Sequence, residues 1–321
     1  MKKITFLLFA LSFTHHSYCW GFYAHEKINY LSVFLLPPEM IGFYKKHIDY
    51  IREHATDPDK RRYAIPEEGP RHFIDINRYG TYPFSALPRI YDSAIALYSM
   101  DTIQAHGIVP WWILMMKARL TKAFKEKNTH KILQLSAEIG HYIGDAHVPL
   151  HACSNHNGQY TNQHGIHGFW ESRIPELLTE PEFDLWTGKA DYIPDPLNFI
   201  WQRVMESAVA ADTVLKFEQA LSARFPSDKK FAFEVRNGII SRQYASAYTR
   251  AYNAMLEGMV ERRMRQSIYA TASFWYTAWV DAGQPDLRSL TEYLIAEEDK
   301  KESEALEKSW RMGKIKGRGC E

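Results

Sequence analysis

Residues 141–151 read His-Tyr-Ile-Gly-Asp-Ala-His-Val-Pro-Leu-His, and this stretch combines a helical pattern with candidate metal ligands. His141 and Asp145 are four residues apart, which places an imidazole and a carboxylate about 40° apart on one helical face. The apolar residues of the segment recur at helical spacing on a different face, so the polar pair does not belong to the ordinary core stripe. Pro149 ends the helix, and His151 follows in the turn.

Two glycines, Gly140 and Gly144, flank this polar pair. Each costs a helix interior about 1 kcal/mol relative to alanine. Two such residues within one helical turn therefore predict that a neighbouring element approaches the helix closely.

A second imidazole–carboxylate pair, His167 and Glu171, follows with the same spacing. One such pair is usually an exposed polar pair, but two pairs with His151 between them gather many nitrogen and oxygen donors in a short segment. Zinc accepts both donor types, and the chain has no Cys-x-x-Cys pattern of the kind that builds thiolate structural sites. The pattern therefore favours a catalytic metal over a structural one.

Further candidate ligands lie nearer the N-terminus. His25 precedes a predicted amphipathic helix, Asp57 and Asp59 flank a proline, and residues 72–75 read His-Phe-Ile-Asp. Aspartate before proline is a common turn residue, and a histidine among apolar neighbours is more often a satisfied core residue than a ligand. Neither Asp57 nor His72 therefore identifies a site by itself.

The first nineteen residues have the pattern of a secretory signal peptide. Two lysines precede an apolar run from Ile4 to Phe13, which is too short to cross a bilayer as a helix. Cleavage after Cys19 would make Trp20 the first residue of the mature chain, and no later window is long and apolar enough for a transmembrane segment. We therefore expect a secreted or periplasmic protein.

The mature chain, residues 20–321, is predicted to be one all-α domain with a charged C-terminal tail over about 297–321. The full chain has a formal net charge of +1, which gives no basic field for nucleic acid or an anionic membrane. Helical periodicity dominates, and we find no clean two-residue alternation with hairpin turns. Irregular loops are expected at 56–85, 152–166 and 181–196. The predicted helices cover residues 26–36, 38–54, 86–104, 109–127, 129–147, 168–178, 197–222, 229–264, 266–281 and 287–308.

Taken in chain order, these residues resemble the superfamily that unites zinc-dependent bacterial phospholipase C with the fungal-type single-strand-specific zinc nucleases. The match runs over residues 20–171, about half of the chain. Its most specific part is the His141-x3-Asp145-x5-His151 segment with a proline inside it, whereas beyond residue 180 it rests on helical character alone. The resemblance implies an all-α fold with three zinc ions at the bottom of a cleft.

The resemblance also implies a ligand set for each ion, with Asp145 bridging the first two. Asp57 has two possible roles, as a ligand in the nuclease branch or as a general base in the phospholipase branch, and Asp59 lies close by. The ligands implied for the first zinc are His72, His141, Asp145 and Asp57. Those of the second are Asp145, His25 and the amino nitrogen and carbonyl oxygen of Trp20. Those of the third are His151, His167 and Glu171.

The implied chemistry is hydrolysis of a phosphate ester by a zinc-bound hydroxide. Glu171 as the last ligand favours the phospholipase branch, whereas residues 145–151 look more like the nuclease version. We therefore expect a phospholipase-C-like phosphodiesterase acting on a phospholipid headgroup, with a secreted single-strand nuclease or nucleotidase acting on nucleic acid as the alternative. In the nuclease branch Phe73 and Asp75 would contact a base; otherwise they are a packed aromatic and a turn aspartate. A third possibility is an exported zinc-binding domain that hydrolyses nothing.

Overall fold

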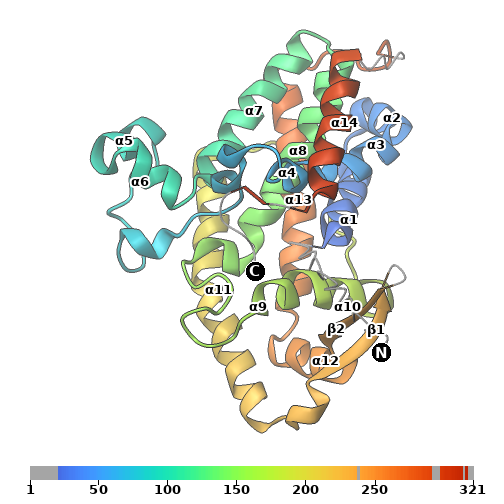
Figure 1. Ribbon diagram of the computed structural model, residues 1–321. Coiled ribbons are helices and arrows are strands. Elements are labelled where there is room, and N and C mark those ends of the chain that lie inside the picture. Colours follow the sequence, from blue (N-terminus) through green and yellow to red (C-terminus); the bar gives the residue numbers. More distant parts are fainter. Residues whose placement is uncertain (1–20, 237–238, 291–296, 314, 317–321) are drawn as a thin grey trace, which may run out of the picture.

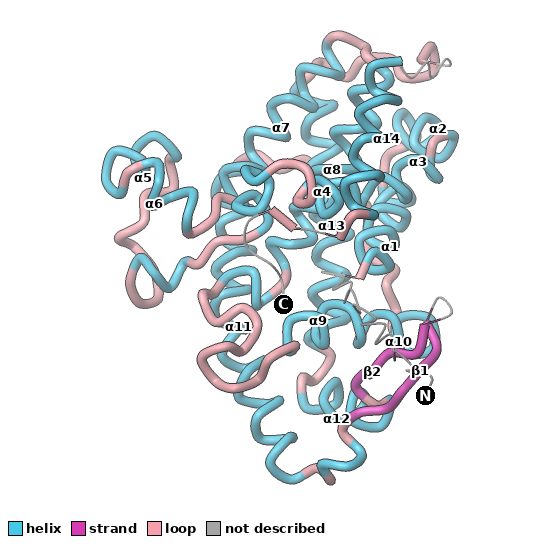
Figure 2. The backbone as a smooth tube through the Cα atoms, viewed as in Figure 1, coloured by secondary structure: helices cyan, strands magenta, loops and turns pink. Residues whose placement is uncertain are grey.

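The computed structural model describes residues 21–236, 239–290, 297–313 and 315–316. This part of the chain is largely helical, with one small β-hairpin (Figures 1 and 2). The helix bounds predicted from the sequence agree best for the long helices. These are α7 (Val109–Lys125), α8 (Thr129–His147) and α11 (Pro196–Arg224), whereas α13 (Met259–Asp281) begins seven residues before its predicted start at residue 266.

Helix α8 is the centre of the fold. It contacts α7, α11 and α13, and α1 (Phe22–Ser32) packs beside it as well. Asn128 caps its first turn by accepting a hydrogen bond from the Lys131 amide at 3.0 Å. Because neighbouring helices surround it, every residue from 136 to 147 is buried. The polar residues of this half of α8 therefore lie inside the protein and need partners there.

Shorter elements complete the chain and lie around these long helices. Between α1 and α7 they are α2 (Pro38–Lys46), α3 (Ile48–Glu53), α4 (Asp57–Arg61), α5 (Tyr91–Tyr98), α6 (Met100–Ala105) and the 3₁₀ turns Val33–Leu35, His54–Thr56, Pro66–His72 and Ile76–Tyr79. After α8 come the 3₁₀ turn Pro149–Ala152, α9 (Ile166–Gly168), a π-helical turn (Phe169–Arg173), α10 (Ile174–Glu182), the 3₁₀ turn Ser227–Lys229, β1 (Phe231–Arg236), β2 (Ile239–Tyr244), α12 (Ser246–Met255) and α14 (Glu297–Arg311).

The close approach predicted from Gly140 and Gly144 is confirmed, and α1 is the element that approaches. A Cβ atom on Gly140 would lie 2.0 Å from the side-chain oxygen of Asn29, and one on Gly144 would lie 3.1 Å from the His25 ring. Asn29 also donates from its side chain to the Ala137 carbonyl of α8 at 2.9 Å. The two glycines therefore let α1 bring His25 against α8.

We expect Gly140→Ala to destabilise the fold, although alanine is the better helix former. The added methyl would overlap the buried Asn29 amide, and overpacking of this kind costs about 1–3 kcal/mol. Urea unfolding of the variant measures the effect. Gly42→Ala in α2 is the matched control, because nothing lies within 4 Å of that Cβ position. Equal stability of the two variants would contradict the close packing of α1 on α8.

The predicted helix 229–264 is wrong in its N-terminal part, where β1 and β2 lie, whereas α12 and the start of α13 are helical as predicted. Strands β1 and β2 pair in antiparallel fashion, with Val235 opposite Ile240, and α13 runs without a break through the boundary expected at residue 265. Aromatic and β-branched residues alternate with others before Asn237-Gly238, and such a pattern followed by Asn-Gly is a strong hairpin signal. The hairpin was not predicted because the apolar residues that follow it have helical spacing. The Asn-Gly pair itself lies outside the described residues.

The described part of the C-terminal helix, α14, packs on the protein instead of extending into solvent, and residues 287–290 of the predicted helix are not helical. It contacts α4, and its Trp310 ring lies 5.6 Å from the ring of Phe22 at the start of α1. Beyond it, the Lys316 amide donates to the Arg62 carbonyl at 2.9 Å. The loop expected at 56–85 is likewise partly helical, because it contains α4 and two 3₁₀ turns.

Candidate metal centre

Three groups of histidine and carboxylate side chains lie around the C-terminal half of α8. In each group the possible ligand atoms lie within 4.8 Å of one another. No member is more than 6% exposed, so bringing these polar groups together is costly unless something compensates them. The groups are His72, His141 and Asp59; His25, His141 and Asp145; and His151, His167 and Glu171.

The first group has the spacing of donors around one ion. His141 Nε2 lies 3.0 Å from His72 Nδ1, and these nitrogens lie 3.3 Å and 2.9 Å from Asp145 Oδ2. Asp59 Oδ1 lies 3.8 Å from each of the two nitrogens. Tetrahedral coordination with bonds of about 2.0–2.1 Å separates neighbouring donors by about 3.3 Å. The four donors therefore fit a tetrahedrally bound metal ion.

The structure brings Asp59 to this group, and not Asp57, which was expected from the sequence. The two aspartates are two residues apart in α4, about 200° around the helix, so their side chains point to different sides. Asp57 instead accepts hydrogen bonds from His54 at 2.5 Å and from Lys60 at 3.1 Å. Burial would raise the pKa of Asp57, but these two neighbours hold it below its usual value.

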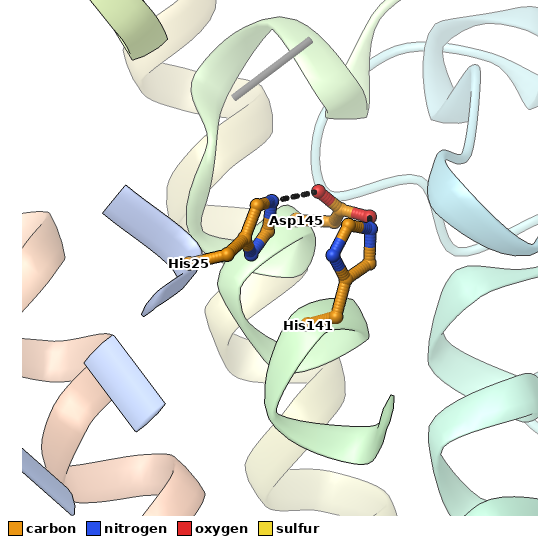
Figure 3. A group of neighbouring side chains, drawn as sticks. All are labelled: His25, His141 and Asp145. Carbon is orange, nitrogen blue, oxygen red and sulfur yellow. Dashed lines mark ion pairs between the residues drawn. The ribbon is translucent and has the colours of Figure 1, made fainter. Parts of the chain in front are cut away.

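The second group lies on the other side of the Asp145 carboxylate. His25 Nε2 is 3.5 Å from Asp145 Oδ1, whereas Oδ2 faces the first group, and the His25 ring stacks on His141 at 3.8 Å (Figure 3). Each oxygen of Asp145 therefore faces a different set of imidazoles, which is the arrangement expected of a bridging carboxylate. The remaining expected ligand of this group, Trp20, lies outside the described residues, as does the predicted signal peptide.

The third group joins the turn after α8 to the segment that precedes α10. Glu171 directs one oxygen to His151 Nε2 at 3.2 Å and the other to His167 Nε2 at 3.1 Å. Glu171 lies in the π-helical turn Phe169–Arg173, and such turns are frequent at functional sites. The four-residue spacing of His167 and Glu171 in the sequence thus brings them together, as expected.

Backbone carbonyls fix the orientation of three of these imidazoles. Since a carbonyl only accepts, the Nδ1 atom that faces it carries the proton, and the lone pair of Nε2 is left to face the centre. Nδ1 of His141 donates to the Ala55 carbonyl at 2.9 Å. Nδ1 of His151 donates to the His72 carbonyl at 2.5 Å, and Nδ1 of His167 donates to the His156 carbonyl at 3.0 Å.

His72 is oriented by a carboxylate that the sequence reasoning missed. Its Nε2 lies 3.5 Å from Glu68 Oε1, so that its Nδ1 faces the first group. Glu68 is fully buried and accepts hydrogen bonds from Arg71 and Tyr142. Burial would raise the pKa of Glu68, but His72 and the two nearby arginines, Arg61 and Arg71, lower it to about 2. The four-residue spacing of Glu68 and His72 was the available signal.

Protons and carboxylates balance one another in the metal-free centre. Burial would lower the pKa of His141, but the carboxylates of Asp145 and Asp59 outweigh it and raise this pKa to about 9. Burial would raise the pKa of Asp145, but His141 and His151 hold it well below its usual range. For His25, burial and the neighbouring His141 both lower the pKa. A bound cation would take the place of the histidine protons.

Phe73 and Asp75 are both buried, at 8% and 6% exposure. The Phe73 carbonyl packs against Gly107, whose φ of 87° and lack of a side chain permit the contact. The Asp75 amide donates to the His106 carbonyl at 2.7 Å. Both backbones are therefore held by the connection between α6 and α7, and a substrate contact by either side chain stays a prediction.

No protein-family model and no curated protein matches this chain. In the described parts of the sequence, no helix is long and apolar enough to cross a membrane. The fold and the three side-chain groups together define a largely helical protein with a candidate multi-metal centre.

Proposed function

We propose that this protein is an exported zinc-dependent phosphoric ester hydrolase. The observation that carries the proposal is the position of Asp145, which faces two groups of imidazoles with its two oxygens while a third group lies beside them. Closely spaced metal ions are typical of enzymes that transfer or hydrolyse phosphate esters. The resemblance of residues 20–171 to the phospholipase C and zinc nuclease superfamily supports the same reaction class.

Each ion would have its own set of donors in this proposal, and Asp145 would be shared by two sets. Trp20 would complete the second set through its free amine and carbonyl once the signal peptide is removed. The first set would be Asp59, His72, His141 and Asp145; the second Asp145, His25 and Trp20; and the third His151, His167 and Glu171.

Zinc bound at these positions supplies an activated water and a positive field for the phosphate oxygens. Asp59 has the position to take a proton in such a reaction. In the absence of metal, burial raises the pKa of Asp59 despite the nearby His141 and His72. Its Oδ1 faces the first group, and in the described part of the chain its Oδ2 makes no hydrogen bond. Asp59 thus takes over the role expected of Asp57, as ligand or as base.

We further propose that the substrate is a phospholipid, cleaved on the glycerol side of the phosphate as in the phospholipase C branch. Glu171 as the last ligand favours this branch, and a net charge of +1 offers no field for a polyanion. The test is a side-by-side assay of zinc-loaded protein on phosphatidylcholine, single-stranded DNA, RNA and mononucleotides. Hydrolysis of phosphatidylcholine that is lost with a chelator and restored by zinc supports the proposal. Activity on nucleic acid alone identifies the nuclease branch, and three bound zinc ions without any turnover identify a non-catalytic domain.

Zinc binding near pH 7 is expected to release protons. His141 has a pKa of about 9 in the metal-free protein and is therefore protonated near pH 7, whereas a metal ligand must be neutral. His25, whose pKa is lowered, contributes no proton. Calorimetric titration in buffers of different ionisation enthalpy measures the number of protons released. This number should decrease as the pH rises above the pKa of His141. A binding enthalpy independent of the buffer near pH 7 would contradict the electrostatic description of the centre.

A further inference from the structure

The β1–β2 hairpin carries three large apolar side chains on its outer face. Phe233, Val235 and Ile240 are 77%, 71% and 70% exposed. Val235 and Ile240 are cross-strand partners, and Phe233 is two residues further along β1, so the three side chains lie on one face. Exposed apolar side chains that lie next to one another, unlike single scattered ones, indicate an interaction surface. We call these three residues the apolar tip.

One cation lies directly behind the apolar tip. Arg242 is the cross-strand partner of Phe233 and is exposed on the same face, with its guanidinium 4.1 Å from the centre of the Phe231 ring. Glu234 follows Phe233 in β1, so its side chain points to the opposite face of the hairpin. There its carboxylate accepts a hydrogen bond from Arg173 at 2.5 Å. The whole chain has no basic field, but this outer face combines apolar side chains with a local positive charge and, among its described side chains, carries no negative one.

The base of the hairpin is fixed beside the candidate metal centre. Tyr244 of β2 stacks on Phe169 with ring centres 3.8 Å apart, and its carbonyl accepts from Arg173 at 3.0 Å. Phe169 and Arg173 bound the π-helical turn that contains Glu171 of the third group. Figure 1 shows the hairpin at the edge of the molecule beside α10 and α12. The apolar tip is therefore held in a set position relative to the centre.

We propose that this hairpin docks the protein on the surface of an anionic phospholipid membrane, an inference that rests on the proposed phospholipase function. The Val235–Ile240 pair lies two residues beyond the Phe233–Arg242 pair, or about 7 Å along the strands. Interfacial segments bury apolar side chains by about 5–10 Å at the boundary between headgroups and acyl chains. With the apolar tip at that depth, Arg242 reaches the phosphates, which guanidinium groups bind well.

Vesicle co-sedimentation tests the docking without requiring turnover. The probes are vesicles of phosphatidylcholine alone and of phosphatidylcholine mixed with phosphatidylserine. We expect a variant with Phe233→Ser, Val235→Ser and Ile240→Ser to lose binding to mixed vesicles by about tenfold or more, because insertion scales with buried apolar area. Leu97→Ser with Met100→Ser is the matched control, since these two residues of the α5–α6 region are also exposed, and it should bind like the wild type.

A second variant, Arg242→Gln, separates the charge from the apolar contribution and keeps the test decisive if the triple variant does not fold. It should weaken binding to mixed vesicles several-fold and leave binding to phosphatidylcholine alone unchanged, because the attraction to anionic lipid is electrostatic. The proposal would be overturned if the wild-type protein did not bind mixed vesicles, or if the hairpin variants bound them as tightly as the wild type does. So would a loss of dimers in the variants by sedimentation velocity, which would make a second copy of the chain the partner.

Hydrolysis of a soluble phosphodiester distinguishes this proposal from the proposed function. The triple variant should keep the wild-type kcat/KM on bis(p-nitrophenyl) phosphate and lose turnover on vesicles. If vesicle binding depends on the hairpin but the protein hydrolyses neither substrate, only the enzyme proposal is contradicted. If the protein hydrolyses both substrates but the hairpin variants bind vesicles like the wild type, only the docking proposal is contradicted.

Discussion

Replacing Asp145 by asparagine is expected to remove more zinc and more activity than replacing any single histidine. Each oxygen of Asp145 faces a different group of imidazoles, and its negative charge would offset the repulsion between two neighbouring cations. We expect the variant to lose about two zinc ions per chain and more than about 100-fold in turnover, because even outer partners of a metal typically account for 10–100-fold.

Metal analysis and turnover of the same preparation measure this effect. Glu138→Gln is the matched control, because Glu138 is a buried carboxylate on the same helix that pairs with Arg61 and belongs to no metal-ligand group. This control should keep its zinc. If Asp145→Asn retained full zinc content and activity, the bridging role would be wrong.

The second large effect concerns the two aspartates of α4. Asp59→Asn should lower turnover by about 100-fold, the scale of general acid–base catalysis or of a lost ligand. Asp57→Asn should leave turnover nearly unchanged, because Asp57 pairs with His54 and Lys60 and does not face the centre. The two substitutions are chemically identical and lie in the same helix, so each serves as the control of the other.

Zinc content separates the two possible roles of Asp59. A variant that loses one ion per chain identifies a ligand, whereas a variant that keeps all its zinc and loses turnover identifies a base. The opposite ranking, with Asp57→Asn inactive and Asp59→Asn active, would contradict the placement of α4 against the first group.

The long helices could be predicted from the sequence because their apolar residues repeat at helical spacing. The bounds of α8 are those predicted, since Asn128 caps its start and Pro149 follows its end. The prediction of helical segments failed where tertiary contacts determine the local structure, as in the 3₁₀ turn Pro66–His72, which lies in a segment expected to be a loop. The hairpin was missed because the helical periodicity on one side of it was extended across an Asn-Gly pair.

The candidate site was predictable where two ligands share one helical turn. The spacing of His141 with Asp145, and of His167 with Glu171, places each pair on one face whatever the rest of the chain does. Distant partners depend on the tertiary fold, so the choice between Asp57 and Asp59 needed the orientation of α4. The backbone carbonyls that orient the imidazoles were likewise beyond the reach of a pattern of ligand residues, whereas Glu68 could have been found from its four-residue spacing to His72.

Zinc content of the mature chain tests the central proposal most directly. Protein that begins at Trp20 should bind close to three zinc ions, because three groups of donors are present and each suits one ion. Protein with one additional residue before Trp20 should bind about two, since the amide that replaces the free amine is a poor ligand. A mature chain that binds one zinc ion or none would contradict the trinuclear centre.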